Sequence, residues 1–219
     1  MKRNLTELVF ILDRSGSMGG LESDTIGGFN SMLMKQKKEQ GKCRITTVLF
    51  DNEYEILHDR IDINAIGPIT DKEYYVRGST ALLDAIGRTV NKIDSVQKNT
   101  SEEYRAEKVL FIITTDGMEN ASREFGYKKI KSMIEKQKSK HCWEFIFLGA
   151  NIDAVEVANQ FGISRNRTQN FHNDSAGIAL NYSVLSETVA SYRAAPCGTS
   201  IHDSWGDDIQ ADYKKRGNN

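Results

Sequence analysis

The sequence predicts an α/β protein: a Rossmann-like, doubly wound and mostly parallel sheet with one antiparallel edge strand and helices on both faces. Two apolar runs, residues 8–12 and 108–115, have the length and composition of strands that are buried on both faces. Stretches with helical spacing of apolar residues separate most predicted strands, and this alternation is typical of parallel sheets. Two other strands flank a short turn at residues 51–53 and must pair antiparallel, which suits a sheet edge.

The first half of the chain contains clear start and stop signals. Ser23-Asp24 is expected to cap a helix, and Gly41 is a plausible stop for it. Residues 64–79 contain two glycines and a proline, so we expect a loop there that approaches the end of the first strand. In order, the predicted elements are a strand at 8–12, a helix to about residue 40, and strands at 44–50 and 54–63.

The second half repeats the pattern of the first, because another buried strand ends on a carboxylate, Asp116. A polar connection at residues 102–107 precedes this strand. The predicted helices span residues 80–96, 125–139, 154–161 and 175–194, and the predicted strands span 108–115, 143–149 and, at the second sheet edge, 167–171.

Composition sets the broad class of the protein. Hydrophobic residues make up 39% and charged residues 27% of 219 residues, which is typical of a soluble globular domain. The net charge of −1 creates no strong field toward nucleic acid or a membrane, so we expect neither as a partner. The apolar run before Asp13 is too short for a secretory signal, and no apolar stretch could span a membrane.

The cysteines favour a reducing compartment. Cys43, Cys142 and Cys197 are odd in number, widely spaced and free of any C-x-x-C pattern. A disulfide framework or a thiolate zinc site is therefore not favoured, and the four histidines show no metal-ligand spacing either. We expect a cytoplasmic protein.

The predicted domain covers residues 1–195, and residues 196–219 are predicted to form a polar tail. Only Ile201, Trp205 and Ile209 are large apolar residues in the tail. Because so few apolar residues can anchor this segment, we expect it to be mobile.

Oxygen-bearing side chains follow the two central strands where each strand ends. Asp13, Ser15 and Ser17 follow the first apolar run, and Asp116 follows the strand at 108–115. The right-handed crossover rule makes these strands neighbours, so both carboxylates should lie on one rim of the sheet. Carboxylate and hydroxyl oxygens suit a hard divalent cation such as Mg²⁺.

Three separated segments resemble the metal-ion-dependent adhesion site (MIDAS) of von Willebrand factor type A (VWA) domains. They are Asp-x-Ser-x-Ser at residues 13–17, Gly-Ser-Thr at 78–80 and Thr-Thr-Asp-Gly at 114–117. The order of the segments also matches, and the resemblance covers roughly residues 5–195. Residues 117–120 and 147–151 are similar to stretches of intracellular bacterial VWA proteins.

The resemblance implies which residues would hold a metal ion. Ser15, Ser17 and Thr80 would ligate Mg²⁺, or alternatively Mn²⁺ or Ca²⁺, through their hydroxyl groups. Asp13 and Asp116 would hold the ion directly or through water.

Each of these residues also has an ordinary structural interpretation. The two serines could be loop hydroxyls that cap the next helix, and Thr80 stands where an N-cap is expected. Asp116-Gly117 could form a plain turn. Asp84, one helical turn after Thr80, is expected to support the ligands or face solvent rather than bind metal.

The site favours a metal-dependent, non-enzymatic protein-binding module. Hydroxyl ligands leave the charge of a cation poorly neutralised, so an open coordination position would attract an Asp or Glu of a protein partner. The alternative is a metal-dependent hydrolase or phosphotransferase that uses Asp13 and Asp116. A phosphotransferase of the haloacid-dehalogenase type usually has a second Asp where Ser15 stands, and the glycines after the first strand lack a nucleotide-binding spacing.

Overall fold

A six-stranded sheet in the order β3-β2-β1-β4-β5-β6 forms the centre of the computed structural model, which describes residues 4–217. All neighbouring pairs are parallel except β2 and β3, which are antiparallel. The predicted fold class, the antiparallel edge and the central pair of first and fourth strands are therefore confirmed. The strands are β1 (Leu5–Asp13), β2 (Lys42–Phe50), β3 (Tyr54–Asp62), β4 (Lys108–Thr115), β5 (Glu144–Gly149) and β6 (Thr168–Asn170).

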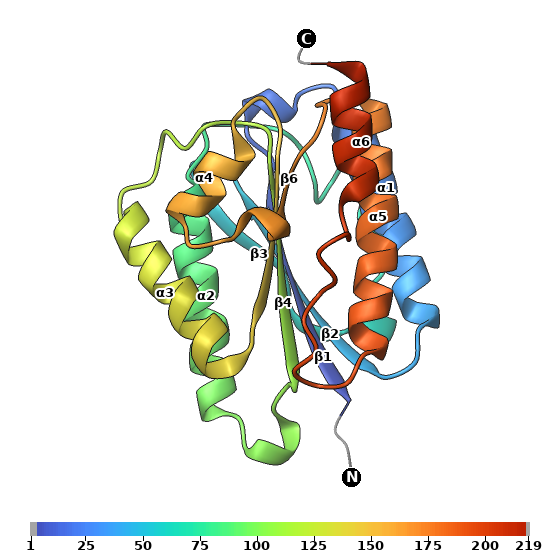
Figure 1. Cartoon of the computed structure of the whole chain (residues 1–219), viewed down its shortest axis with the longest axis vertical. Helices are drawn as coiled ribbons and strands as arrows, with labels where there is room; N and C mark the ends of the chain where they lie inside the picture. The colour runs from blue at the N-terminus through green and yellow to red at the C-terminus, as the bar shows by residue number, and fades with distance from the viewer. Residues whose placement is uncertain (1–3, 218–219) are drawn as a thin grey trace.

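Helices cover both faces of the sheet, which stands edge-on in Figure 1. Three of them, α2, α3 and α4, lie on one face, and α1, α5 and α6 lie on the other. The helices are α1 (Glu22–Lys38), α2 (Leu82–Asn99), α3 (Tyr127–His141), α4 (Ala154–Gln160), α5 (Ser175–Ala194) and α6 (Asp207–Arg216).

The central strand β1 is buried along its whole length. Its side chains alternate between the two cores, as the pleat of a strand requires. Phe10 belongs to the core beneath α1 and α5, whereas Val9 and Ile11 belong to the core beneath α2 and α3. Burial on both faces explains the uncharged run in the sequence.

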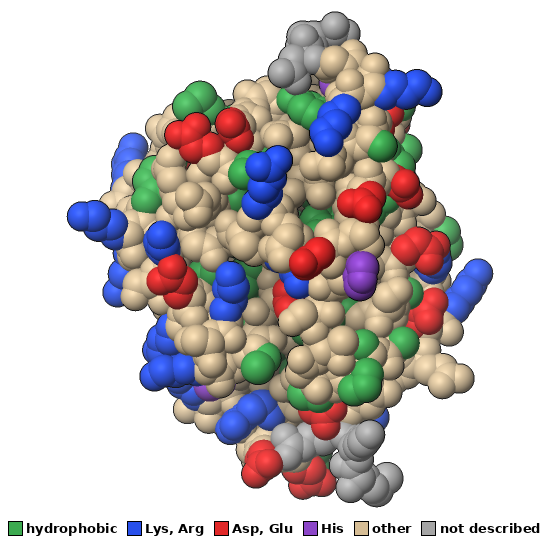
Figure 2. All heavy atoms as spheres, viewed as in Figure 1, with side chains coloured by type: hydrophobic (Ala, Val, Ile, Leu, Met, Phe, Trp, Pro, Cys, Tyr) green, Lys and Arg blue, Asp and Glu red, His purple; other side chains and the backbone are tan. Residues whose placement is uncertain are grey.

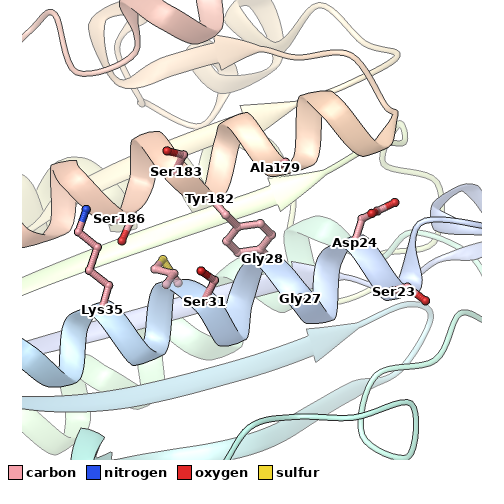
Figure 3. A pocket seen from close by; sticks show the side chains of 11 residues that line it. Ser23, Asp24, Gly27, Gly28, Ser31, Lys35, Ala179, Tyr182, Ser183 and Ser186 are labelled. Carbon is pink, nitrogen blue, oxygen red and sulfur yellow. The ribbon is translucent and has the colours of Figure 1, made fainter.

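Helices α1 and α5 pack closely because Gly28 has no side chain. A Cβ atom at this position would lie 2.1 Å from Cδ2 of Tyr182, whose ring packs over the glycine in Figure 3. A groove of about 530 Å³ remains between the two helices, lined mainly by small residues.

The structure differs from the expected mobile tail. Ile201, Trp205 and Ile209 are buried, and the chain continues into helix α6, which packs on α5. The indole N–H of Trp205 donates to the carbonyl oxygen of Asn166 (2.9 Å), and Arg167 donates to the carbonyl oxygen of Ile201 (2.6 Å). Three apolar anchors and these polar contacts hold a segment whose composition alone suggested no packing.

Three predicted helix starts are also wrong by about two residues, among them that of α3, which begins at Tyr127 rather than at residue 125. Helix α1 begins at Glu22 rather than after a Ser23-Asp24 cap, and its N-cap position, Leu21, makes no side-chain capping bond. Helix α2 begins at Leu82 rather than at Thr80. Of the residues expected to cap these helices, Asp24 accepts the hydroxyl of Ser175 (2.6 Å), and the backbone N–H of Thr80 donates to Asn120.

The surface carries charges of both signs. Lys and Arg side chains are interspersed with Asp and Glu over most of the face shown in Figure 2. Within residues 4–217, none of the helices has the length and apolar character needed to cross a bilayer.

Candidate metal centre

The predicted site lies where β1 and β4 end, at the carboxyl edge of the parallel strands. Asp13 is the last residue of β1, and Asp116 directly follows β4. The two strands pair in parallel with Leu12 beside Thr114, so their ends reach the same rim. Both carboxylates are about 1% exposed and therefore need polar partners within the protein.

The hydroxyl groups of Ser15 and Ser17 lie beside Asp116. The two Oγ atoms are 3.1 Å apart, and Ser17 Oγ donates to Asp116 Oδ1 at 2.5 Å. Ser15 precedes a short 3-10 helix, Gly16–Met18, without making a side-chain capping bond. The serine hydroxyls are thus not used as helix caps.

The Thr80 side chain approaches the same point from the start of α2. A Cβ atom built on Gly117 would lie 3.2 Å from both Ser17 Oγ and Thr80 Oγ1. Ala81, not Thr80, occupies the N-cap position of α2. The backbone N–H of Thr80 donates to Asn120 Oδ1 (3.0 Å), which ties this segment to the loop after β4.

Asp13 is held in one orientation by two hydrogen bonds. Its Oδ1 atom accepts the backbone N–H of Ser15 (2.7 Å), and its Oδ2 atom accepts the hydroxyl of Thr115 (2.6 Å). Burial raises the pKa of the Asp13 carboxyl to about 6, opposed by the bonds from Ser15 and Thr115 and reinforced by the charge of Asp116. Burial also raises the pKa of Asp116, and the bond from Ser17 opposes this rise.

An ion network centred on the buried Asp51 joins the loops around the site. The fully buried Arg14 donates to Asp51 Oδ2 (2.9 Å), and Arg77 donates to the same oxygen (2.8 Å). The carbonyl oxygen of Asp51 accepts the backbone N–H of Ala81 (2.9 Å). The end of β1, the β2–β3 turn and the Thr80 segment are therefore joined through one carboxylate residue.

Gly78 allows two of these loops to approach each other. Its φ of +69° is left-handed, and a Cβ atom there would lie 2.0 Å from Asn52 Oδ1. Its carbonyl oxygen accepts the backbone N–H of Gly16 (3.1 Å). Glycine is the residue that meets both requirements.

Asp84 joins the start of α2 to the loop that follows Asp116. Its carboxylate accepts the backbone N–H groups of Arg123, Glu124 and Phe125, each at 2.9 Å. In return, Glu119 and Ser122 accept the N–H groups of Leu83 and Asp84 at the otherwise unpaired helix start. Asp84 is thus buried and supports the loops of the site, which agrees with the expected supporting role and not with the expected alternative of exposure to solvent.

Three contacts of this site were not predicted from the sequence. Thr115 binds Asp13, Asn173 Nδ2 donates to Asp116 Oδ2 (2.8 Å), and Tyr74 donates its hydroxyl to the carbonyl oxygen of Asp13 (2.6 Å). Thr115 was detectable as the neighbour of Asp116. No local pattern marks Asn173 or Tyr74 as a contact of this site, although Tyr74 lies in the loop at residues 64–79 that the sequence predicts to approach the end of β1.

The donor set fits a hard divalent cation. Within residues 4–217 no group of three or more His, Cys, Asp or Glu could hold a metal, so an ion here would depend on hydroxyl groups as well as on the two carboxylates. Oxygen ligands of Mg²⁺ lie about 2.1 Å from the ion and hence about 3 Å from one another. The spacings of 2.5 Å and 3.1 Å among Asp116, Ser17 and Ser15 are close to this value.

Solved structures with similar folds include VWA domains. The von Willebrand factor domain of the type V pilus tip protein Mfa5 from Porphyromonas gingivalis aligns with a TM-score of 0.59 at 12% identity, over 90% of this chain and 98% of that one. Proximal thread matrix protein 1 from the mussel byssus aligns with a TM-score of 0.57 at 15% identity, over 90% of this chain and 48% of that one. The fold is therefore that of VWA domains.

Two similar structures contain a metal ion. Manganese-loaded TRAP protein from Plasmodium vivax aligns with a TM-score of 0.52 at 17% identity, over 81% of this chain and 72% of that one. A second structure of the mussel protein, of which this chain spans 46%, has a zinc-occupied MIDAS motif. No protein-family model matches the sequence, and no curated protein matches it either.

Proposed function

We propose that this chain is a metal-dependent, non-enzymatic protein-binding module. Ser15, Ser17 and Thr80 bind one Mg²⁺ ion through their hydroxyl groups, with Asp116 and Asp13 acting directly or through water. Mn²⁺ and Ca²⁺ are alternative ions. The observation that carries the proposal is a chain of contacts from Ser15 Oγ to Ser17 Oγ (3.1 Å) and from Ser17 Oγ to Asp116 (2.5 Å). Thr80 Oγ1 lies at the same place, because a Cβ atom on Gly117 would be 3.2 Å from both Thr80 Oγ1 and Ser17 Oγ.

The partner would supply a carboxylate to the ion. With neutral hydroxyl groups among its ligands, the cation keeps much of its charge, and a remaining position favours an Asp or Glu of another protein. The exposed Met118 and the partly exposed Tyr75 belong to loops that lead to the site and offer apolar contacts around it.

A hydrolase or phosphotransferase is the second candidate, but no observation favours it. Both Asp13 oxygens already accept hydrogen bonds, which lowers the nucleophilicity of this carboxylate. Ser15 stands where a phosphotransferase of this type would have its general acid.

A cytoplasmic location is part of the proposal. Cys43 is buried, Cys142 and Cys197 are exposed, and all three are free thiols. Exposed free thiols are typical of proteins in reducing compartments.

Calorimetric titration with Mn²⁺ and Mg²⁺ tests the metal site. We expect one site that is lost in Asp116→Ala and Asp13→Ala but unchanged in Asp59→Asn, a control in the exposed part of β3. Equal binding in all variants would refute the site. Hydrolysis of p-nitrophenyl phosphate with Mg²⁺, lost in Asp13→Asn, would favour the enzymatic alternative instead.

The partner is tested by recovering proteins from native lysate with Mg²⁺ or with chelator. The binder should require Mg²⁺ and should bind poorly to Asp116→Ala. A partner whose binding is affected neither by chelator nor by Asp116→Ala would use another surface.

A further inference from the structure

The two carboxylate oxygens of Asp116 have different hydrogen-bond partners. Ser17 donates to Oδ1 at 2.5 Å, from the loop after β1. Asn173 donates to Oδ2 at 2.8 Å, from the loop between β6 and α5. With one donor on each oxygen, rotation of the carboxylate about its Cβ–Cγ bond is restricted.

The chemistry of the pair fixes which end of the Asn173 amide faces Asp116. An ionised carboxylate only accepts hydrogen bonds, so the amide must present its N–H group. The Oδ1 atom of Asn173 is buried and accepts no hydrogen bond from residues 4–217. Within residues 4–217, the side-chain amide therefore makes its one hydrogen bond at the metal site.

The backbone around Asn173 is held by both C-terminal helices. The N–H of Asp174 donates to the carbonyl oxygen of His172 (2.9 Å), which closes a tight turn around Asn173. Asp174 caps α5 by accepting the N–H of Gly177 (2.8 Å) and accepts a second bond from Arg216 of α6 (2.5 Å). His172 stacks on Tyr213 of α6, with ring centroids 4.8 Å apart.

From these contacts we propose that Asn173 is a positioning residue for the metal centre. It holds Oδ2 of Asp116 toward the β6–α5 loop, so that Oδ1 stays on the side of the Ser17 hydroxyl, where the ion would bind. This inference rests on the proposed function, since it assumes that Asp116 serves a cation. Outer residues that orient metal ligands typically change metal affinity about 10–100-fold when they are removed.

Asn151 provides a matched control. It is also an asparagine in a loop that follows a strand, here β5, but among residues 4–217 its Nδ2 atom donates only to the backbone carbonyl oxygen of Asp116, at 3.4 Å. Asn151→Ala removes an amide of the same size from the same rim and leaves the Asp116 carboxylate contacts intact.

The test measures Mn²⁺ affinity by calorimetry for the wild type, Asn173→Ala and Asn151→Ala, together with the urea midpoint of each metal-free protein. We expect about tenfold weaker Mn²⁺ binding in Asn173→Ala, less than about twofold weakening in Asn151→Ala, and similar midpoints for the wild type and Asn173→Ala. The midpoint of Asn151→Ala should fall, because the φ of +55° at this position disfavours alanine. In addition, the side-chain amide signal of Asn173 can be assigned in the ¹H–¹⁵N spectrum of the wild type, because it is missing from the spectrum of Asn173→Ala. This signal should shift when the wild type is saturated with Mg²⁺.

The outcomes separate this inference from the proposed function. Unchanged affinity in Asn173→Ala, equal losses in both variants, or a loss matched by a fall in the urea midpoint would overturn the positioning role alone. A wild type that binds neither Mn²⁺ nor Mg²⁺ would overturn the proposed function, and the positioning role with it.

Discussion

The hydroxyl of Thr115 donates a 2.6 Å hydrogen bond to the Asp13 carboxylate and thereby joins the carboxyl ends of β1 and β4. Thr115 is the last residue of β4, and its side chain is buried together with Asp13. The bond offsets part of the cost of burying a carboxylate but does not abolish it, because burial still dominates the pKa of Asp13.

The metal-free protein should lose stability as the pH rises from about 4 to about 6. The pKa of Asp13 is about 6 in the folded protein, against 3.8 for an ordinary Asp, so the folded state binds the proton more tightly than the unfolded state. The contribution of protonated Asp13 to the free energy of unfolding is therefore fully present below about pH 4 and is lost as the pH rises through about 6. This difference in the pKa of Asp13 between the folded and unfolded states corresponds to about 3 kcal/mol of unfolding free energy at most.

Urea denaturation between pH 4 and pH 7 in chelator checks this prediction. The slope of stability against pH should be more negative for the wild type than for Asp13→Asn, whose side chain does not titrate. Equal slopes for the two proteins would contradict the prediction. Because protons and metal ions compete for carboxylates, added Mn²⁺ should stabilise the wild type more at pH 7 than at pH 5.

Replacing Asp84 by Ala should loosen the loop that follows Asp116. The change leaves three backbone N–H groups, those of residues 123–125, without their acceptor. Each buried donor without a partner costs about 1–3 kcal/mol, so we expect a loss of roughly 3 kcal/mol or more in the free energy of unfolding. Asp94→Ala on the same helix is the control, and hydrogen exchange of residues 119–125 reports whether the loop opens first.

Thr80→Val should weaken metal binding and, through it, partner binding. The substitution keeps the volume of a side chain that is 3% exposed and removes only the hydroxyl. Chelator and Thr80→Val should therefore weaken partner binding by similar factors, and chelator should add little to the variant. Simple additivity of the two effects would show that the partner binds elsewhere.

The partner itself should contain one acidic residue that dominates the contact. Changing that Asp or Glu to its amide should cost about 2–5 kcal/mol of binding free energy if the contact is desolvated. An alanine scan of acidic positions on the partner, with and without Mg²⁺, measures this. Equal small losses at several acidic positions would instead indicate general electrostatic attraction.

Trp205→Ala should destabilise the fold although it lies outside the predicted domain. The indole is buried against the core beneath α5, and truncation of such a side chain typically costs about 3–5 kcal/mol. Tyr104→Ala removes an exposed aromatic ring and serves as the control. Equal urea midpoints for the two variants would show that the segment from residue 201 contributes little.

The sequence predicts the sheet well because buried strands have a strong local signal. The run before Asp13 is uncharged since both of its faces are covered, and the crossover rule then makes β1 and β4 neighbours. Helix α6 gives no such signal. Ile201, Trp205 and Ile209 stand four residues apart, but they are isolated in a polar segment and only Ile209 lies within α6. Their burial depends on α5 and on residues 166–167.

The candidate site is predictable only in its motif residues. Asp13, Ser15, Ser17, Thr80 and Asp116 come together as expected, but their role as ligands is still a prediction. Tyr74, Asp84 and Asn173 support the site through hydrogen bonds between segments distant in sequence. Such pairings depend on loop conformation, which neither periodicity nor composition specifies.

The location of helix α6 also affects the tendency of the sheet to associate with other chains. Open edge strands promote aggregation, and this sheet has two ends. At one end, β3 is irregularly paired with β2 and carries Asp59, Arg60 and Asp62, which discourage pairing with a further strand. At the other end, β6 is only three residues long and packs against α6, so its unpaired edge is short and partly covered. A version of the protein that ends before residue 201 would lose that cover, and we expect it to be prone to intermolecular strand pairing at high concentration.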